Sequence, residues 1–267
     1  MADPAEIERE VAQMAEYWGE RREGWRDAAA DEFERIVMPA CLYGPEQDFR
    51  RLQMVNMCFT EWVLFERPLR EGKTPLQLYV ETPPEGTLES TVDHLRQIDE
   101  TQFFARFAIL DKEPETSRAM LLDVGTDRRY EVCDGALCKN ARWRNGTIAE
   151  RIACVDGLWQ VVGQVHLYDR ADPDATRVDG PGALHPDDLR AEDMCEAGLF
   201  LRLVRDVLGV DGRYAPTLSM VSVEGGCEIR RESLLCETPE RFSWGVCEGV
   251  RRMVRFCGLF VPPARLE

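Results

Sequence analysis

Apolar residues recur at helical spacing through the first part of the chain. Over residues 7–18 they fall at intervals of four, three and four, which places them on one stripe of a helix while charged residues occupy the other faces. The same reasoning predicts a second helix over residues 25–37 and a third, with the most regular stripe, over residues 46–66. Because each stripe must pack against another element, we expect a helical N-terminal part over residues 1–82.

A short fourth helix is predicted to begin at Thr74 and Pro75, because threonine can cap a helix and proline suits its first position. The tripeptide Gly72-Lys73-Thr74 also resembles the end of a phosphate-binding loop. That loop needs a glycine five residues before its second one, and Arg67 stands there instead. The sequence therefore excludes this type of nucleotide-binding loop.

From residue 103 onward the period of the apolar positions changes to two, after a helix predicted over residues 87–99. Five strands are predicted, over residues 103–110, 119–124, 130–133, 147–155 and 158–168. The last two are joined at Asp156-Gly157, a pair that favours the positive φ angles of a tight hairpin. We therefore expect a central antiparallel β-meander, within a unit spanning residues 87–168, that packs on helices.

The last of these strands carries the histidine of greatest interest. Its apolar positions, which are Trp159, Val161, Val165 and Leu167, alternate with the polar positions Gln160, Gln164 and His166. Such alternation indicates one buried face and one face toward water. We therefore expect His166 on the polar face, where it is a candidate for a catalytic or ligand role.

Residues 170–186 are rich in Asp, Pro and Gly, which predicts a linker or a long surface loop. A helix over residues 187–208, a hairpin across Gly225-Gly226 and a final helix are predicted beyond it. They form a C-terminal helix-hairpin-helix part over residues 187–267. The fold class expected for the whole chain is α+β.

Composition is that of a globular protein, with 44% hydrophobic and 31% charged residues among 267. The net charge, 33 minus 49 or −16, opposes the phosphate backbone, so direct nucleic-acid binding is not expected. No apolar run has the length of a membrane span, and the acidic N-terminus lacks the pattern of a secretory signal. We expect a cytoplasmic protein without a membrane partner. A protein partner is compatible with these features, and the sequence does not fix the oligomeric state.

Ten cysteines are then read as free, mostly buried thiols of a reducing compartment. They are Cys41, Cys58, Cys133, Cys138, Cys154, Cys195, Cys227, Cys236, Cys247 and Cys257. No C-x2-C pair, the usual sign of a zinc site, occurs among them. The one alternative is a metal site in which Cys133 and Cys138, the nearest to a close pair, are completed by Cys154 and His166. We expect no cofactor.

Catalytic motifs are absent at the level of sequence. No serine lies in a G-x-S-x-G frame, and the chain has only three histidines. His94 lies beside Asp93 on a predicted helix and is interpreted as a surface residue. His185 falls in the predicted loop, which leaves His166 as the candidate catalytic residue.

Two stretches of the chain resemble a group of uncharacterised bacterial proteins that often carry a C-terminal SEC-C zinc motif. The motifs are Phe59-x-x-Trp62-x-x-Phe65 with Gly72-x-Thr74-Pro75-Leu76, and then Leu121-Leu122-Asp123-Val124, Tyr130-Glu131-Val132 and Ala149-Glu150-Arg151-Ile152. The resemblance implies a helical N-terminal part that leads into a small β domain, and it implies no activity. The zinc motif itself needs C-x-C, which this chain lacks.

The leading hypothesis is therefore a non-catalytic protein with an interaction or regulatory role. The first alternative is an enzyme whose site assembles in space near His166, with Cys133, Cys138 and Cys154 as its neighbours. The second alternative is an acidic protein that imitates DNA, which would need carboxylates spaced along one elongated face.

Overall fold

The computed structural model describes residues 3–42, 49–169, 198–209, 219–223 and 226–230. Its helices are α1 Pro4–Glu20, α2 Arg26–Val37, η1 Ala40–Leu42, α3 Phe49–Phe65, α4 Pro75–Glu81, α5 Glu89–Thr101, α6 Gly135–Lys139 and α9 Gly198–Leu208. Its strands are β1 Phe103–Glu113, β2 Arg118–Asp123, β3 Arg129–Cys133, β4 Thr147–Val155, β5 Leu158–Val161, β6 Val165–Asp169, β7 Ser219–Val223 and β8 Gly226–Arg230. The mixed α+β class is confirmed.

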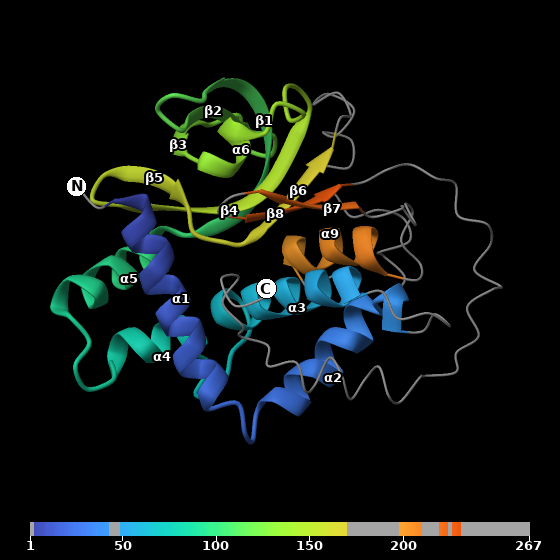
Figure 1. Ribbon diagram of the computed structural model, residues 1–267. Coiled ribbons are helices and arrows are strands. Elements are labelled where there is room, and N and C mark those ends of the chain that lie inside the picture. Colours follow the sequence, from blue (N-terminus) through green and yellow to red (C-terminus); the bar gives the residue numbers. More distant parts are fainter. Residues whose placement is uncertain (1–2, 43–48, 170–197, 210–218, 224–225, 231–267) are drawn as a thin grey trace.

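A helical layer covers one side of the strands (Figure 1). The core cluster formed with α2, α3 and α9 includes Ala149 and Val165 of the sheet. A second cluster, formed with α1, α4 and α5, includes Ala153 and Val155 at the far end of β4. The odd-numbered residues of β4 therefore face the helices, and the N-terminal helical part and the strands share one interior.

The predicted meander is wrong, because the strands close into a five-stranded barrel. Strands β1, β2 and β3 do pair in sequence order, but β1 also pairs with β4, and β3 pairs in parallel with β5. Strand β1 can serve both neighbours because its register with β2 shifts between Ile109 and Asp111. Such a bulge bends a strand and lets it turn around a barrel. The sequence pattern shows the strands but not this long-range closure.

Between the third and fourth strands of the barrel lies α6, an element that the sequence pattern does not predict. Its Ala136, Leu137 and Cys138 are buried together with barrel residues such as Phe107 and Ile148. Helix α6 thus joins β3 to β4, and β5 closes the barrel by pairing in parallel with β3. Fold alone assigns no function.

The predicted last strand is two strands, β5 and β6, that follow each other along the same side of β4. The break at residues 162–164 changes which positions face the helices: Trp159 and Val161 pack against the barrel cluster, whereas Val165 and Leu167 belong to the helix-facing cluster. The expectation of a solvated polar face is therefore wrong. His166 is buried, because it falls on the barrel side after the break.

Several local predictions are confirmed. Thr74 caps α4 in a capping box with Gln77, and Pro75 occupies its first turn. Asp156 and Gly157 both have positive φ in the β4–β5 turn. Strands β7 and β8 pair as a hairpin, and β8 lies parallel to β6.

The predicted loop over residues 170–186 and the final helix lie outside the described residues, as does the start of the helix predicted from residue 187. Within the described part of the chain, the helices are too short or too polar to cross a membrane. The predicted division into parts at residues 82, 87 and 187 stays a prediction.

We expect Phe107→Ala to lower the free energy of unfolding by about 3–5 kcal/mol, because its ring is fully buried inside the barrel. Leu110 lies on the same strand with 45% of its surface exposed, so Leu110→Ala is the matched control and should change stability by about 0.5 kcal/mol or less. Urea unfolding followed by circular dichroism measures both. Equal losses would contradict the assignment of the barrel interior.

Candidate cation site in the barrel

Three buried side chains from three elements converge on the barrel side of β4. They are Asp134, which precedes α6, Glu150 of β4 and His166 of β6, with 3%, 0% and 2% of their surfaces exposed. One oxygen or nitrogen of each lies within 4.8 Å of those of the other two. The Nε2 atom of His166 is 3.9 Å from Oδ2 of Asp134 and 3.7 Å from Oε2 of Glu150.

Asp134 is held in place by its role as the N-cap of α6. Its Oδ1 accepts a hydrogen bond of 2.9 Å from the backbone amide of Leu137. A capping aspartate uses one oxygen in this way because the first amides of a helix lack partners within it. The other oxygen, Oδ2, remains available on the side of His166.

Glu150 and His166 lie together because of the register between β4 and β6. Ile148 pairs with Tyr168 and Ala149 pairs with Leu167, so Glu150 and His166 follow next along the two strands on the same face. This face carries Ile148 and Tyr168, which belong to the barrel cluster. The carboxylate and the imidazole are thus directed toward the same interior.

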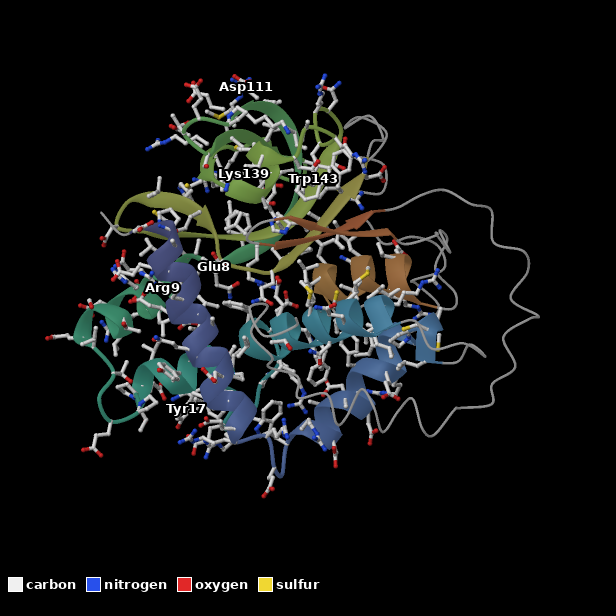
Figure 2. The ribbon with its side chains drawn as sticks, in the orientation of Figure 1. Glu8, Arg9, Tyr17, Asp111, Lys139 and Trp143 are labelled. Carbon is white, nitrogen blue, oxygen red and sulfur yellow. The ribbon has the colours of Figure 1, made fainter. Side chains whose placement is uncertain are left out.

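Trp143 covers His166 from the turn after α6, beside that helix (Figure 2). The indole stacks on the imidazole with ring centroids 5.8 Å apart and planes inclined by 27°. The hydroxyl of Tyr168 donates a 2.6 Å hydrogen bond to the carbonyl of Asn145 and so holds the same turn. The site is therefore closed toward solvent by a fixed aromatic layer.

Lys112 holds the other end of this cover. Its Nζ donates hydrogen bonds to the carbonyls of Leu137 and Asn140, at 3.0 and 2.5 Å. Partial burial lowers the pKa of this ammonium group. Its contacts are with the end of α6, where a cation also meets the negative end of the short helix.

Within the described part of the chain, five polar atoms of the three residues have no hydrogen-bond partner: Oδ2 of Asp134, both carboxyl oxygens of Glu150 and both ring nitrogens of His166. A buried polar atom without a partner destabilises a fold by about 1–3 kcal/mol, and more for a charged group. Burial, followed by the neighbouring Asp134 carboxylate, raises the pKa of Glu150 well above its ordinary value. A divalent cation would satisfy these atoms at once, since imidazole nitrogen and carboxylate oxygen are ligands of divalent transition metals.

Of the residues singled out from the sequence, the structure brings only His166 into this group. Cys138 is a buried residue of α6, and Cys133 and Cys154 are half-buried free thiols. None of the three joins the group among the described residues. The sequence reasoning did not single out Glu150, although it stands between Ile148 and Ile152 on a buried face, and this carboxylate in an apolar face was the available signal.

The interpretation of His94 as a surface residue is wrong. Its Nδ1 lies 2.8 Å from Oε2 of Glu10, and its side chain is 12% exposed. Thr91 donates a 2.7 Å hydrogen bond to the other oxygen of Glu10. Helix α5 therefore meets a buried carboxylate of α1, which a single-helix pattern does not show. His185 lies outside the described residues.

On the opposite face of β4, Arg151 forms a second buried polar group with two carboxylates of α3. Its Nε donates a 3.1 Å hydrogen bond to Glu61, and a second nitrogen donates to Glu66. The third donates a 2.6 Å hydrogen bond to Gln102. The guanidinium carbon also lies 5.1 Å from the centre of the Phe65 ring. All of its nitrogens are thus used within the fold, which explains how it is buried.

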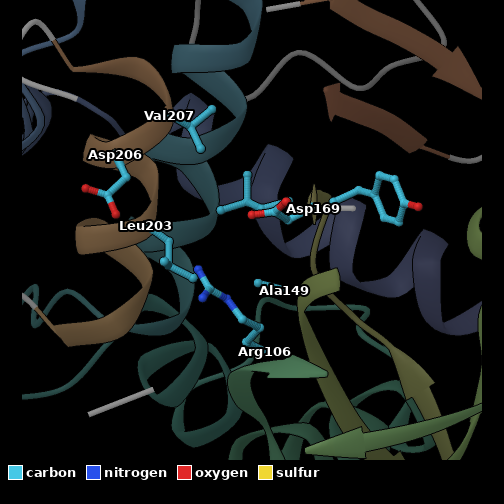
Figure 3. Close-up of a pocket in the computed structure, with 8 residues that line it drawn as sticks. Arg106, Ala149, Asp169, Leu203, Asp206 and Val207 are labelled. Atoms are coloured by element: carbon cyan, nitrogen blue, oxygen red, sulfur yellow. The ribbon is translucent and has the colours of Figure 1, made fainter. Parts of the chain in front are cut away.

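A pocket of about 370 Å³, counted with its open side, lies between α9 and the strands (Figure 3). Arg106, Asp169 and Asp206 provide charges of both signs around an apolar floor of Ala149 and Leu203. Its charged lining does not select one class of ligand.

No family model and no curated protein matches the sequence, and no solved structure matches the fold.

The pKa of Cys138 is raised to about 11, chiefly by burial and then by the Asp134 carboxylate. Only the thiolate is nucleophilic, so we expect iodoacetamide to leave Cys138 unmodified at pH 8 and to react as the pH approaches 11. Peptide mapping by mass spectrometry measures the modification. The urea-unfolded chain is the reference, and equal labelling of Cys138 in folded and unfolded protein at pH 8 would disprove the burial.

We expect Arg151→Met to lower the free energy of unfolding by about 3–5 kcal/mol, because Glu61 and Glu66 would lose their buried counter-charge. Arg118 offers a matched control, since it pairs with Glu131 in an exposed position. Arg118→Met should change stability by about 1 kcal/mol or less. Chemical denaturation of the two variants tests the difference.

Proposed function

We propose that this chain is a non-catalytic, regulatory or interaction protein whose barrel binds one divalent transition-metal ion through Asp134, Glu150 and His166. The observation that carries the proposal is the set of five unpartnered polar atoms on three side chains that are at least 97% buried. Two carboxylates lie within 4 Å of one imidazole, and this concentration of acidic oxygens favours a bound cation.

The donor set indicates the class of cation. One imidazole nitrogen with carboxylate oxygens suits zinc, manganese or iron, whereas a calcium or magnesium site is built from oxygen ligands. Asp134 is already oriented by its bond to Leu137, so one of the ligands is fixed by a second interaction. Zn²⁺ and Mn²⁺ are therefore the probes of choice.

The closure of the site supports a binding role over catalysis. Trp143 stacks on His166, and all three residues are buried, so a substrate would need part of the fold to move before it reached the ion. The alternative of an enzyme assembled near His166 uses the same three side chains and requires that movement. The hypothesis of an acidic DNA mimic rests on the net charge alone and stays a prediction.

We expect Zn²⁺ or Mn²⁺ to bind the purified, chelator-treated protein at one ion per chain and to raise its melting temperature. At a free cation concentration one hundred times the dissociation constant, the stabilisation should be about 2.7 kcal/mol. Glu150→Gln and His166→Gln should abolish both effects. Calorimetric titration and thermal unfolding measure them.

His94→Gln is the matched control, because His94 also contacts a buried carboxylate but lies outside the proposed site. Its response to the cation should equal that of the wild type. A wild-type protein that binds neither ion would overturn the proposal, and so would an unchanged response in Glu150→Gln.

A further inference from the structure

We propose that Glu61 of α3 is the positioning residue of this cation site, an inference that rests on the proposed function. Its carboxylate lies on the helix side of the sheet, 2% exposed, and does not belong to the ligand group. It nevertheless binds the backbone or side chain next to two of the three ligands. It therefore controls where those ligands point.

The two carboxyl oxygens of Glu61 bind different partners. Oε1 accepts the 3.1 Å hydrogen bond from Nε of Arg151, which follows the ligand Glu150. Oε2 accepts hydrogen bonds from the backbone amides of Gln164 and Val165 at 2.8 and 2.9 Å. Val165 immediately precedes the ligand His166. Because neighbouring residues of a strand point to opposite faces, a group held on the helix side fixes its neighbour on the barrel side.

The two amides come from the break between β5 and β6. There Val162 donates a 3.0 Å hydrogen bond to the carbonyl of Arg151, and Gln164 and Val165 turn their amides to Glu61 instead of to β4. In an uninterrupted strand, His166 would stand on the face opposite to Trp159 and Val161. The break puts all three on the barrel side. By accepting hydrogen bonds from the two amides of the break, Glu61 stabilises the backbone arrangement that places His166 on the same face as Glu150.

Gly163 shows how closely the backbone approaches this carboxylate. A Cβ atom at Gly163 would lie 2.6 Å from Oε1 and 2.7 Å from Oε2 of Glu61, closer than real contacts allow. Only glycine lets the break close on the carboxylate without displacing it. Gly163→Ala therefore moves the carboxylate while leaving every partner of Glu61 in the chain.

The test measures cation affinity and coordination in the full chain, using Co²⁺ as a spectroscopic probe and Zn²⁺ in competition with a coloured chelator. Glu61→Gln and Gly163→Ala should each weaken Zn²⁺ binding by about 10–100-fold, the range found when a group that orients a metal ligand is lost. Both should also change the visible absorption spectrum of bound Co²⁺, which reports ligand geometry and not stability. Glu61→Asp keeps the charge but shortens the side chain. Its Zn²⁺ affinity should lie between that of these two variants and that of the wild type.

Glu10→Gln is the structural control. Glu10 is also a buried carboxylate on a helix that accepts hydrogen bonds, and it lies away from the ligand group. Its replacement should lower stability but leave the Zn²⁺ affinity and the Co²⁺ spectrum unchanged. A double-mutant cycle adds a second readout. In the Glu61→Ala background, the methyl group added by Gly163→Ala no longer meets the carboxylate of residue 61. Gly163→Ala should therefore cause no further loss of Zn²⁺ affinity in that background.

The possible failures are distinguishable. If the wild type binds neither Zn²⁺ nor Co²⁺, the proposed function is wrong. If it binds them and the folded variants at Glu61 and Gly163 keep wild-type affinity and spectrum, the positioning role is wrong. If Glu61→Gln does not fold, Gly163→Ala and Glu61→Asp decide the question by the same two measurements.

Discussion

The buried ion pair between Arg151 and Glu61 is the interaction on which the arrangement of helices and barrel depends. Removing two charges from water is costly, and their attraction offsets this only where further hydrogen bonds complete both groups. Here the guanidinium also reaches Glu66 and Gln102, while the carboxylate also holds the two amides of the strand break. Replacement of such a pair by apolar side chains can be neutral for stability. The contacts of this pair instead join α3 to β4 and to the strand break. The pair places α3 against one position of β4.

Strand β4 carries opposite polar chemistry on its two faces. Arg151 on the helix side is surrounded by acceptors, and burial raises the pKa of Glu66 while Arg151 lowers it in part. Glu150, one residue earlier, meets another carboxylate and an imidazole in the barrel, and no guanidinium or ammonium group of the described residues bonds to it. On the helix side, the charged groups find their partners within the protein. On the barrel side, a bound cation would supply the missing partner. This contrast between adjacent residues supports the proposal that the barrel group binds a cation.

Local features of the fold were predictable from the sequence, since they depend on neighbouring residues. The capping box at Thr74 and the turn at Asp156-Gly157 are examples. Barrel closure was not predictable, because it depends on a bulge between Ile109 and Asp111 and on a parallel pair between strands distant in sequence. Of the site, only His166 was recognised. Its burial was missed because a period of two was extended across Gly163, where the glycine marks a break that reverses the faces.

The ion pair and the cation site act on the same strand from opposite sides, and this links three layers of the molecule. Asp134 belongs to the cap of α6 and Glu150 to β4, and Arg151 joins β4 to the helix α3. An ion bound in the barrel would therefore connect α6 to β4 in the way that Arg151 connects β4 to α3. Because the strand break is bound by Glu61, a displacement of α3 would be transmitted to His166, and occupancy of the site would in turn resist that displacement. The buried position of Asp134, Glu150 and His166 would then let a bound cation hold α6, β4 and β6 in one arrangement.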